Sequence, residues 1–316
     1  MVSIIMAIPA FIAGILLLYK GSDVLVDGTS RSAAQLGVPS LIISVIVVAF
    51  GTSAPEFAIS FGAALQNHAD ISIGNIIGSC VANLLLVIGL SALIKPIKIQ
   101  KGVILRELPI VMLVTMVFVV FSLIGLLDQF HVFGGVLFLL FFVLFVWYFI
   151  GCAKKERVVD DSFEKGDKTK NALFIIGGII GVVVGAWFLI ESAVAIAHFF
   201  SIPEMIIALS MVAIGTSLPE LVVSVVASYK GESDIAVGNV LGSNVFNIFL
   251  VIGAAALLIP LNAIGSVDHL IILLLVTVVM FPILRSGHQV SRFEGVFLIG
   301  LYVVFIWYTF FGYLFF

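Results

Sequence analysis

Two glutamates stand within apolar stretches of the sequence, each directly after a proline in the hexapeptides GTSAPE and GTSLPE. Glu56 and Glu220 both lie well inside these stretches. If the stretches are membrane helices, a carboxylate at such a depth costs at least about 2.5 kcal/mol of insertion free energy. One such residue could be a protonated carboxyl that is hydrogen-bonded between helices. Two in the same motif indicate a functional pair that faces a partner or a wet cavity.

Each glutamate is accompanied by hydroxyl side chains on its own helix face. A threonine stands four residues before it and a serine three residues before it, so these side chains share its face. They are Thr52 and Ser53 in the first motif and Thr216 and Ser217 in the second. The proline between them removes an amide donor and disturbs the carbonyl four residues earlier. Freed carbonyls beside a carboxylate are ligands for a hard cation.

A second polar stripe follows each motif, with side chains at intervals of four that line one face of the next predicted helix. The stripes are Asn75, Ser79 and Asn83, then Asn239, Ser243 and Asn247. For the first asparagine of each stripe, helix–helix hydrogen bonding is an equal alternative to a place in the site. The whole set of ligands is oxygen-based, which suits Na⁺ and Ca²⁺ and does not suit Zn²⁺ or Cu⁺. Two carboxylates balance one Ca²⁺, two Na⁺ or two protons, and competition for that charge is a physical basis for exchange.

The two motif pairs belong to an internal duplication. Residues 51–89 align with residues 215–253 without a gap at an offset of 164, and 19 of the 39 positions are identical. Shared apolar composition gives scattered Val, Ile and Leu matches, but it does not give two copies of GTSxPE and GNxxGSxxxN. The sequence therefore contains a repeat.

The composition identifies the elements that must position these residues. The chain has 316 residues, of which 62% are hydrophobic and 10% are charged. A soluble domain has about 25% charged residues, so a soluble enzyme is excluded. Long apolar blocks approach the roughly 20 residues that a membrane helix needs, whereas a membrane barrel alternates polar and apolar residues. We expect an all-α membrane protein.

Ten apolar segments are predicted to be transmembrane helices. They cover about 3–27, 39–66, 71–94, 104–127, 131–152, 172–199, 203–229, 235–259, 267–284 and 293–315. The charged interval 153–171 is predicted to be a solvated linker. It separates a first half, 1–152, with an α-repeat at about 39–94, from a second half, 172–316, with an α-repeat at about 203–259.

The basic residues predict the orientation of these helices, because cytoplasmic connections are enriched in Lys and Arg. With the N-terminus outside, the connections after helices 1, 3, 5, 7 and 9 hold 14 of the 15 basic residues. Both termini are then outside and the 153–171 linker is cytoplasmic. Each half contains an odd number of helices, so the second half is inverted relative to the first. Two inverted five-helix repeats are typical of secondary transporters.

The motif pairs GTSAPE with GNIIGSCVAN and GTSLPE with GNVLGSNVFN resemble the two α-repeats of the cation/calcium antiporter superfamily, in particular the prokaryotic sodium/calcium exchangers. The resemblance implies an ion site among helices 2, 3, 7 and 8, and a sliding movement of helices 1 and 6. It also implies that Asn247 departs from the pattern, because several members carry Asp there and Asn at the place of Asn83. The ligands that it implies are Glu56, Glu220, Thr52, Thr216, Ser79 and Ser243, with the backbone oxygens of Ala49 and Ala213 and with Ser53, Ser217, Asn83 and Asn247 nearby.

The resulting expectation is a monomeric antiporter of the plasma membrane that exchanges Na⁺ for Ca²⁺ and exports Ca²⁺ from the cytoplasm. It needs no cofactor and binds no nucleic acid. The nearest alternative is a Ca²⁺/H⁺ or K⁺-assisted exchanger, because a desolvated carboxylate can take up a proton. A cation channel is a more distant alternative. An enzyme is not expected, because the Asn, Ser and Thr set offers no nucleophile–base couple.

Acidic residues also occur in the first helix of each half. Asp27 and Glu191 correspond at the repeat offset, and Asp23 precedes Asp27 by one turn. They are interpreted as interfacial residues near helix ends, with an ion entry route as the alternative.

Overall fold

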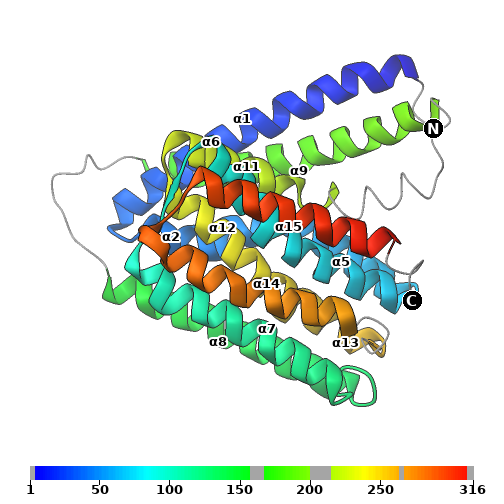
Figure 1. The fold of residues 1–316 in the computed structure, drawn as a ribbon. Coiled ribbons are helices and arrows are strands. Elements are labelled where there is room, and N and C mark those ends of the chain that lie inside the picture. Colours follow the sequence, from blue (N-terminus) through cyan, green and yellow to red (C-terminus); the bar gives the residue numbers. More distant parts are fainter. Residues whose placement is uncertain (1–3, 157–166, 200–214, 263–266, 312–316) are drawn as a thin grey trace.

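The computed structural model describes residues 4–156, 167–199, 215–262 and 267–311, and nearly all of them are helical (Figure 1). Within these ranges, eight helices are long and apolar enough to cross a membrane, and a bent helix pair would make a ninth. Of the predicted segment 203–229, the part before residue 215 lies outside the described residues. The expectation of an all-helical membrane protein is confirmed.

The first half begins with α1 (Ile4–Leu36) and ends with α7 (Leu108–Leu123) and α8 (His131–Lys155). Between α1 and α7 lie two helical segments that are each interrupted by a short π-helical turn. The first segment contains α2 (Ser40–Ile43), η1 (Ser44–Val48), α3 (Ala49–Thr52) and α4 (Ala54–Leu65), and the second contains α5 (Ala69–Ala82), η2 (Asn83–Val87) and α6 (Ile88–Ile94). A further π-helical turn, η3 (Val103–Glu107), directly precedes α7.

The second half begins with α9 (Lys168–Phe199) and ends with α14 (Val267–Arg285) and α15 (Arg292–Phe311). A one-turn helix, η7 (Ser286–His288), follows α14. The described elements between α9 and α14 are α11 (Leu218–Lys230), α12 (Ser233–Val245), η5 (Phe246–Ile252) and α13 (Gly253–Leu258).

Helices α1 and α9 form a closely packed pair along one flank of the bundle (Figure 1). Glycines permit the approach: a Cβ atom on Gly21 would lie 2.7 Å from the amide nitrogen of Val182, and one on Gly178 would lie 2.7 Å from the Cβ of Leu25. Small residues at helix interfaces allow such backbone contact within membranes. The two helices are therefore in backbone contact along the pair, and their buried apolar side chains form one cluster with residues of α11 and α12.

The predicted end of the first helix at residue 27 is wrong, because α1 continues to Leu36. The added segment 28–36 is polar, but it contains no proline, and a helix keeps its own hydrogen bonds after leaving the apolar layer. Gly37, with a φ of 66°, ends the helix in the left-handed conformation that glycine adopts most readily.

The chain bends at Ser53, between α3 and α4, where the two parts of one span meet at 47°. Pro55 lies in the first turn of α4, where its missing amide hydrogen has no helical partner to lose. Ser217 precedes α11 with nearly the same backbone angles as Ser53, and Pro219 takes the equivalent place. Each half thus contains a helix that starts inside the apolar region, directly before its glutamate.

The connections of the two repeats also match. The turn after α4 places Asn67 in the left-handed region, with a φ of 62°, and the turn after α11 places Gly231 there, with a φ of 86°. At the end of the bundle that holds the turn between α11 and α12, strands β1 (Ile97–Lys98) and β2 (Gln289–Val290) form a short antiparallel ribbon, and the backbone amide of Lys98 donates to Ser233 Oγ at 3.1 Å. The sequence did not predict this ribbon, which ties the loop after α6 to the loop after α14.

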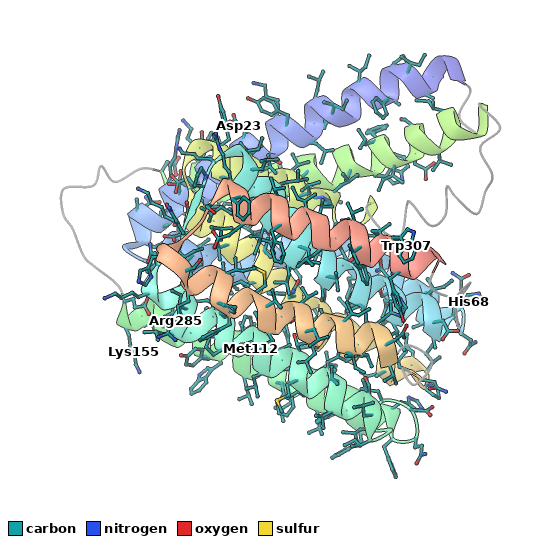
Figure 2. The ribbon with its side chains drawn as sticks, viewed as in Figure 1. Asp23, His68, Met112, Lys155, Arg285 and Trp307 are labelled. Carbon is teal, nitrogen blue, oxygen red and sulfur yellow. The ribbon has the colours of Figure 1, made fainter. Side chains whose placement is uncertain are left out.

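The distribution of polar and apolar side chains is reversed relative to a soluble protein. Large apolar side chains such as Leu105, Trp147 and Phe293 are exposed on the surface, whereas Glu56 and Glu220 are completely buried. This pattern is expected where the surrounding solvent is lipid. The start of α1 and the end of α15 lie at one end of the bundle, while Lys155 and Arg285 lie at the other (Figures 1 and 2).

Candidate ion-binding site

The two glutamates lie at the N-terminal turns of the helices that begin inside the bundle. Glu56 is in the first turn of α4 and Glu220 is in the first turn of α11. A helix N-terminus carries a partial positive charge and free amide hydrogens, which stabilise a nearby anion. The break before each proline therefore places a favourable electrostatic environment at the carboxylate.

Serines of one repeat donate hydrogen bonds to the glutamate of the other. Ser53 Oγ donates to Glu220 Oε1 at 2.9 Å, and Ser217 Oγ donates to Glu56 Oε1 at 3.4 Å. Ser243 Oγ, on α12, adds a second donor to Glu220 Oε1 at 3.2 Å. The two carboxylates are thus held in one connected polar region by groups from both halves of the chain.

Threonines and asparagines form a second set of contacts between the repeats. Thr52 Oγ1 donates to Asn239 Oδ1 at 3.0 Å, and Thr216 Oγ1 donates to Asn75 Oδ1 at 3.3 Å. Ser79 Oγ lies 3.1 Å from Thr216 Oγ1. All five residues are buried. For Asn75 and Asn239, helix–helix hydrogen bonding and a place in the site were equal alternatives. The two are not exclusive, because each amide links the repeats and also contacts a hydroxyl of the candidate site.

Two serines that the sequence reasoning missed anchor these amides. Asn75 Nδ2 donates to Ser60 Oγ at 2.9 Å, and Asn239 Nδ2 donates to Ser224 Oγ at 3.0 Å. Ser60 and Ser224 are identical at the repeat offset, and this signal could have drawn attention to them. Asn244 was also missed, and it carried no such signal because its counterpart is a cysteine.

Several buried polar atoms in this region have no hydrogen-bond partner among the described residues. Four are oxygens: Oε2 of Glu56, Oε2 of Glu220, Oδ1 of Asn83 and Oδ1 of Asn247. The side-chain nitrogen of Asn247 has no such partner either. A buried polar atom without a partner is destabilising, so each such atom calls for an explanation. Carboxylate and amide oxygens that converge in a buried region are suited to a hard cation.

Of the two backbone oxygens that the resemblance implied as ligands, the structure describes that of Ala49 and not that of Ala213. The carbonyl oxygen of Ala49 accepts the backbone amide of Ser53 at 3.0 Å and the hydroxyl of Thr52 at 3.4 Å. A carbonyl has two lone pairs, so it can take part in further contacts only by exchanging one of these partners. Ala213 lies outside the described residues.

Tight helix packing fixes the second polar stripe. A Cβ atom on Gly242 would lie 2.5 Å from the carbonyl oxygen of Val45, and one on Gly238 would lie 2.9 Å from that of Leu41. Helix α12 is therefore pressed against α2 and η1. The segment that would pack equivalently on Gly74 and Gly78 lies outside the described residues.

Within the part of the chain that the structure describes, no group of three or more His, Cys, Asp and Glu side chains is placed to hold a metal ion. The candidate site instead combines two carboxylates with neutral amide and hydroxyl oxygens. Such a set is typical of sites for Na⁺ and Ca²⁺ rather than for Zn²⁺.

Comparisons with known proteins agree with this chemistry. The family model for sodium/calcium exchanger proteins matches residues 6–151 and 170–311. The chain is 34% identical over 320 residues to the inner membrane protein YrbG of Escherichia coli, covering 96% of each chain. It is 30% identical over 340 residues to the sodium/calcium exchanger MaX1 of Methanosarcina acetivorans, covering 93% of this chain and 95% of that one.

A solved structure has the same fold. The sodium/calcium exchanger from Methanococcus jannaschii superposes with a TM-score of 0.85 at 30% sequence identity, over 96% of this chain and 98% of that chain. The resemblance noted in the sequence is therefore confirmed over nearly its whole length. The chain belongs to the sodium/calcium exchanger protein family, a family of membrane transporters.

Proposed function

We propose that the chain is a secondary active antiporter that exchanges Na⁺ for Ca²⁺ and exports Ca²⁺ from the cytoplasm. The observation that supports it best is the pair of buried carboxylates, each with one oxygen bonded across the repeats and the other oxygen without a hydrogen-bond partner among the described residues. The ion ligands are the residues that surround this pair. They are Glu56, Glu220, Thr52, Thr216, Ser53, Ser217, Ser79, Ser243, Asn83 and Asn247, with the backbone oxygens of Ala49 and Ala213.

Charge balance is the reason that exchange follows from such a site. Two buried carboxylates without counter-ions repel each other in a region of low dielectric constant. One Ca²⁺ or two Na⁺ neutralise them equally well, so one ion type can replace the other without leaving the charges exposed. The site favours swapping of ions over simple release.

The proposed topology has ten transmembrane helices in two inverted five-helix halves, 1–152 and 172–316. The linker 153–171 is cytoplasmic and both termini are outside. In its support, Lys155 and Arg285 lie at the end of the bundle opposite His68 and Trp307 (Figure 2), as the positive-inside rule requires if that end is cytoplasmic. We place the chain in the plasma membrane, because its relative YrbG is an inner membrane protein.

Alternating access would come from movement of the α1–α9 pair relative to the rest of the bundle. The two helices contact each other more extensively than either contacts other elements, so they can move together. A transporter of this kind needs two arrangements that differ by only a few kcal/mol. The chain acts as a monomer in this proposal.

Radioactive Ca²⁺ uptake into proteoliposomes tests the coupling ion. Vesicles loaded with Na⁺ are diluted into Na⁺-free buffer, and a matched set carries only a pH gradient. Uptake that requires internal Na⁺ supports the proposal. Uptake that follows the pH gradient and ignores Na⁺ would instead indicate a Ca²⁺/H⁺ exchanger, and a requirement for K⁺ would indicate a K⁺-assisted one. Uptake without any counter-ion, with unitary currents, would indicate a channel.

A further inference from the structure

Asn244 marks a difference between the two repeats beside the candidate site. At the repeat offset it corresponds to Cys80. Asn83 Nδ2 donates a hydrogen bond to Asn244 Oδ1 at 3.1 Å, and Asn244 Nδ2 donates to the backbone oxygen of Cys80 at 3.3 Å. All three residues are completely buried. The Asn244 amide is thus anchored to the backbone at its nitrogen and holds the Asn83 amide at its oxygen.

This contact determines which end of the Asn83 amide is free. Its nitrogen is engaged by Asn244, whereas its Oδ1 has no partner among the described residues. Asn83 follows Ser79 by four residues, and Ser79 contacts Thr216 of the candidate site. We propose that Asn244 is a positioning residue that presents the Asn83 oxygen, and not its nitrogen, to the transported cation. This inference rests on the proposed function.

The equivalent position in the other repeat cannot act in the same way. A thiol offers only a weak donor and a weak acceptor, so Cys80 cannot hold an amide as Asn244 does. The Cys80 thiol lies beside the Asn247 side chain and interacts with it only weakly, and neither polar atom of Asn247 has a strong hydrogen-bond partner among the described residues. The site therefore combines one fixed amide ligand, Asn83, with one adaptable amide, Asn247.

The substitution Asn244→Leu tests the proposal, because leucine has a similar size and cannot accept the hydrogen bond. Outer-shell partners of metal ligands typically contribute 10–100-fold in affinity. We expect the KM for Ca²⁺ to rise about tenfold, with a smaller change in the maximal rate. Thr115→Val is the matched control, since it also replaces a buried polar side chain by an apolar one of similar size, on α7, and it should leave the KM within about twofold.

A double-mutant cycle separates positioning from packing. In an Asn83→Ala background, Asn244→Leu should raise the KM no further. An equal additional rise would overturn the proposal, because it would show that Asn244 acts without Asn83. Asn244→Ala, checked by thermal unfolding, replaces the leucine variant if that variant does not fold. Glu220→Gln is assayed in parallel: if it still exchanges Ca²⁺, the proposed site itself fails, which is a different outcome.

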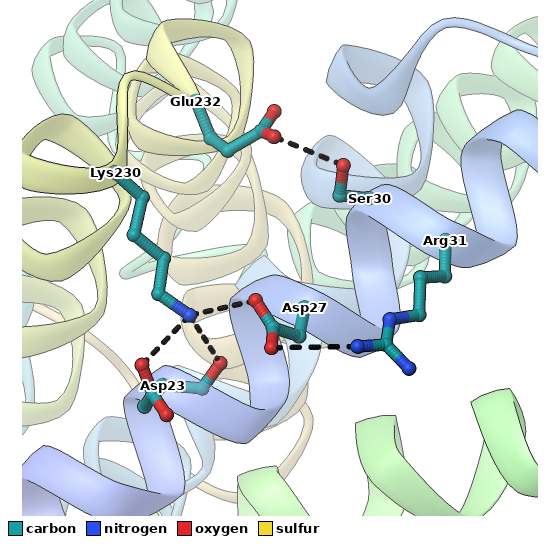
Figure 3. Close-up of polar contacts among 6 residues, drawn as sticks. All are labelled: Asp23, Asp27, Ser30, Arg31, Lys230 and Glu232. Carbon is teal, nitrogen blue, oxygen red and sulfur yellow. Dashed lines mark hydrogen bonds and ion pairs between the residues drawn. The ribbon is translucent and has the colours of Figure 1, made fainter.

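A second, independent observation concerns the end of the bundle where α1 meets the turn between α11 and α12 (Figure 3). The ammonium group of Lys230 lies 2.7 Å from Asp23 Oδ1 and 2.6 Å from Asp27 Oδ1, and it also donates to the backbone oxygen of Asp23 at 3.0 Å. Ser30 Oγ donates to Glu232 Oε1 at 3.0 Å. We call these five residues the Lys230 clasp.

Among the described residues, the other half of the chain has no equivalent of the clasp. At the repeat offset, Lys230 corresponds to Gln66 and Asp27 corresponds to Glu191. Gln66 donates to the backbone oxygen of Gly62 in its own helix, at 3.3 Å. Glu191 is exposed and forms no ion pair with a described residue. Within the part of the chain that the structure describes, ion pairs hold one of the two related ends and not the other.

We infer that the Lys230 clasp closes one end of the transport pathway and opens during each cycle. The side chains of Lys230, Asp23 and Asp27 are 24%, 34% and 41% exposed. Ion pairs that are partly exposed contribute modestly, so the clasp can bias one of two states of similar free energy without locking it. With the proposed orientation, this end is cytoplasmic.

Reversible cross-linking tests the clasp. Ser30→Cys and Glu232→Cys are introduced into a chain in which Cys80 and Cys152 are replaced by alanine. A short bifunctional methanethiosulfonate should reduce Ca²⁺ exchange at least tenfold, and a reductant should restore it. Each single-cysteine variant is the control. Full exchange after complete cross-linking would overturn the inference. Ca²⁺ binding by the cross-linked protein in detergent should persist, which separates a blocked cycle from a damaged ion site.

Discussion

The two repeats are nearly alike at the carboxylates and unlike away from them. Each glutamate accepts a hydrogen bond from the motif serine of the other repeat. Asn75 and Asn239 each accept from the motif threonine of the other repeat and donate to the equivalent serine of their own repeat. By contrast, Asn244 corresponds to Cys80 and Lys230 corresponds to Gln66. The two repeats therefore have equivalent residues around the carboxylates, where charge must be balanced. They have different residues at the Asn83 amide and at the end of the bundle where the Lys230 clasp lies.

The largest expected effect comes from removing the charge of one of the two glutamates. Glu56→Gln and Glu220→Gln remove a charge and keep the shape, so each should reduce Ca²⁺ exchange in proteoliposomes at least about 100-fold, because the site then lacks half of its charge. Asp70→Asn, which removes an exposed carboxylate, is the matched control and should exchange normally. Activity in either glutamine variant that equals the control would exclude that glutamate from the site.

The motif serines of the two repeats differ in the length of their hydrogen bonds to the glutamates. Ser53 Oγ lies 2.9 Å from Glu220 Oε1, and Ser217 Oγ lies 3.4 Å from Glu56 Oε1. A hydrogen bond to a charged group contributes about 1.5–3 kcal/mol. Ser53→Ala should therefore raise the KM for Ca²⁺ about tenfold, and Ser217→Ala should raise it less. The reverse order would show that the shorter contact is not the stronger one.

The pair Asn83 and Asn247 can be made unequal in charge. Asn247→Asp adds a carboxylate to a buried region, and this should increase the pH dependence of exchange and change the ratio of the Ca²⁺ and Na⁺ affinities by a few-fold. Transport measured between pH 6 and 9 checks this. If the profile of the variant matches that of the unmodified protein, Asn247 has a packing role only.

The smallest expected effect concerns the α1–α9 pair, which lies outside the candidate site and in which glycines of both helices make the contact. Gly21→Ala would place a Cβ atom 2.7 Å from the amide nitrogen of Val182, and overpacking of this kind costs about 1–3 kcal/mol. The midpoint of thermal unfolding should fall by several degrees. Gly177→Ala is the matched control on α9, because no atom lies within 4 Å of its added Cβ. A fall of equal size in both variants would refute close packing as the cause.

Much of this arrangement could be predicted from the sequence because it depends on local pattern and repetition. The apolar blocks predicted the helical membrane fold, and the motif at the repeat offset singled out Glu56, Glu220 and their neighbours. Local pattern could not predict that α1 continues to Leu36, because a polar segment can leave the membrane either as helix or as loop. Nor could it predict the ribbon of β1 and β2, which joins residues far apart in the chain.

The partners within the candidate site were also beyond the sequence. Periodicity shows that Asn239 shares a helix face with Ser243, but only the packing of α12 against α2 and α3 brings it to Thr52. Likewise, nothing in the local sequence pairs Asn83 with Asn244 or Lys230 with Asp27. These contacts depend on how two halves of the chain face each other, whereas the sequence pattern describes each half separately.

Direct Ca²⁺ binding to the purified protein at a series of Na⁺ concentrations tests the central claim, that one pair of carboxylates serves both ions. Na⁺ should weaken Ca²⁺ binding competitively, with more than one Na⁺ replacing each Ca²⁺, and Glu220→Gln should abolish Ca²⁺ binding. A Ca²⁺ affinity that is independent of Na⁺, or that persists in Glu220→Gln, would contradict it.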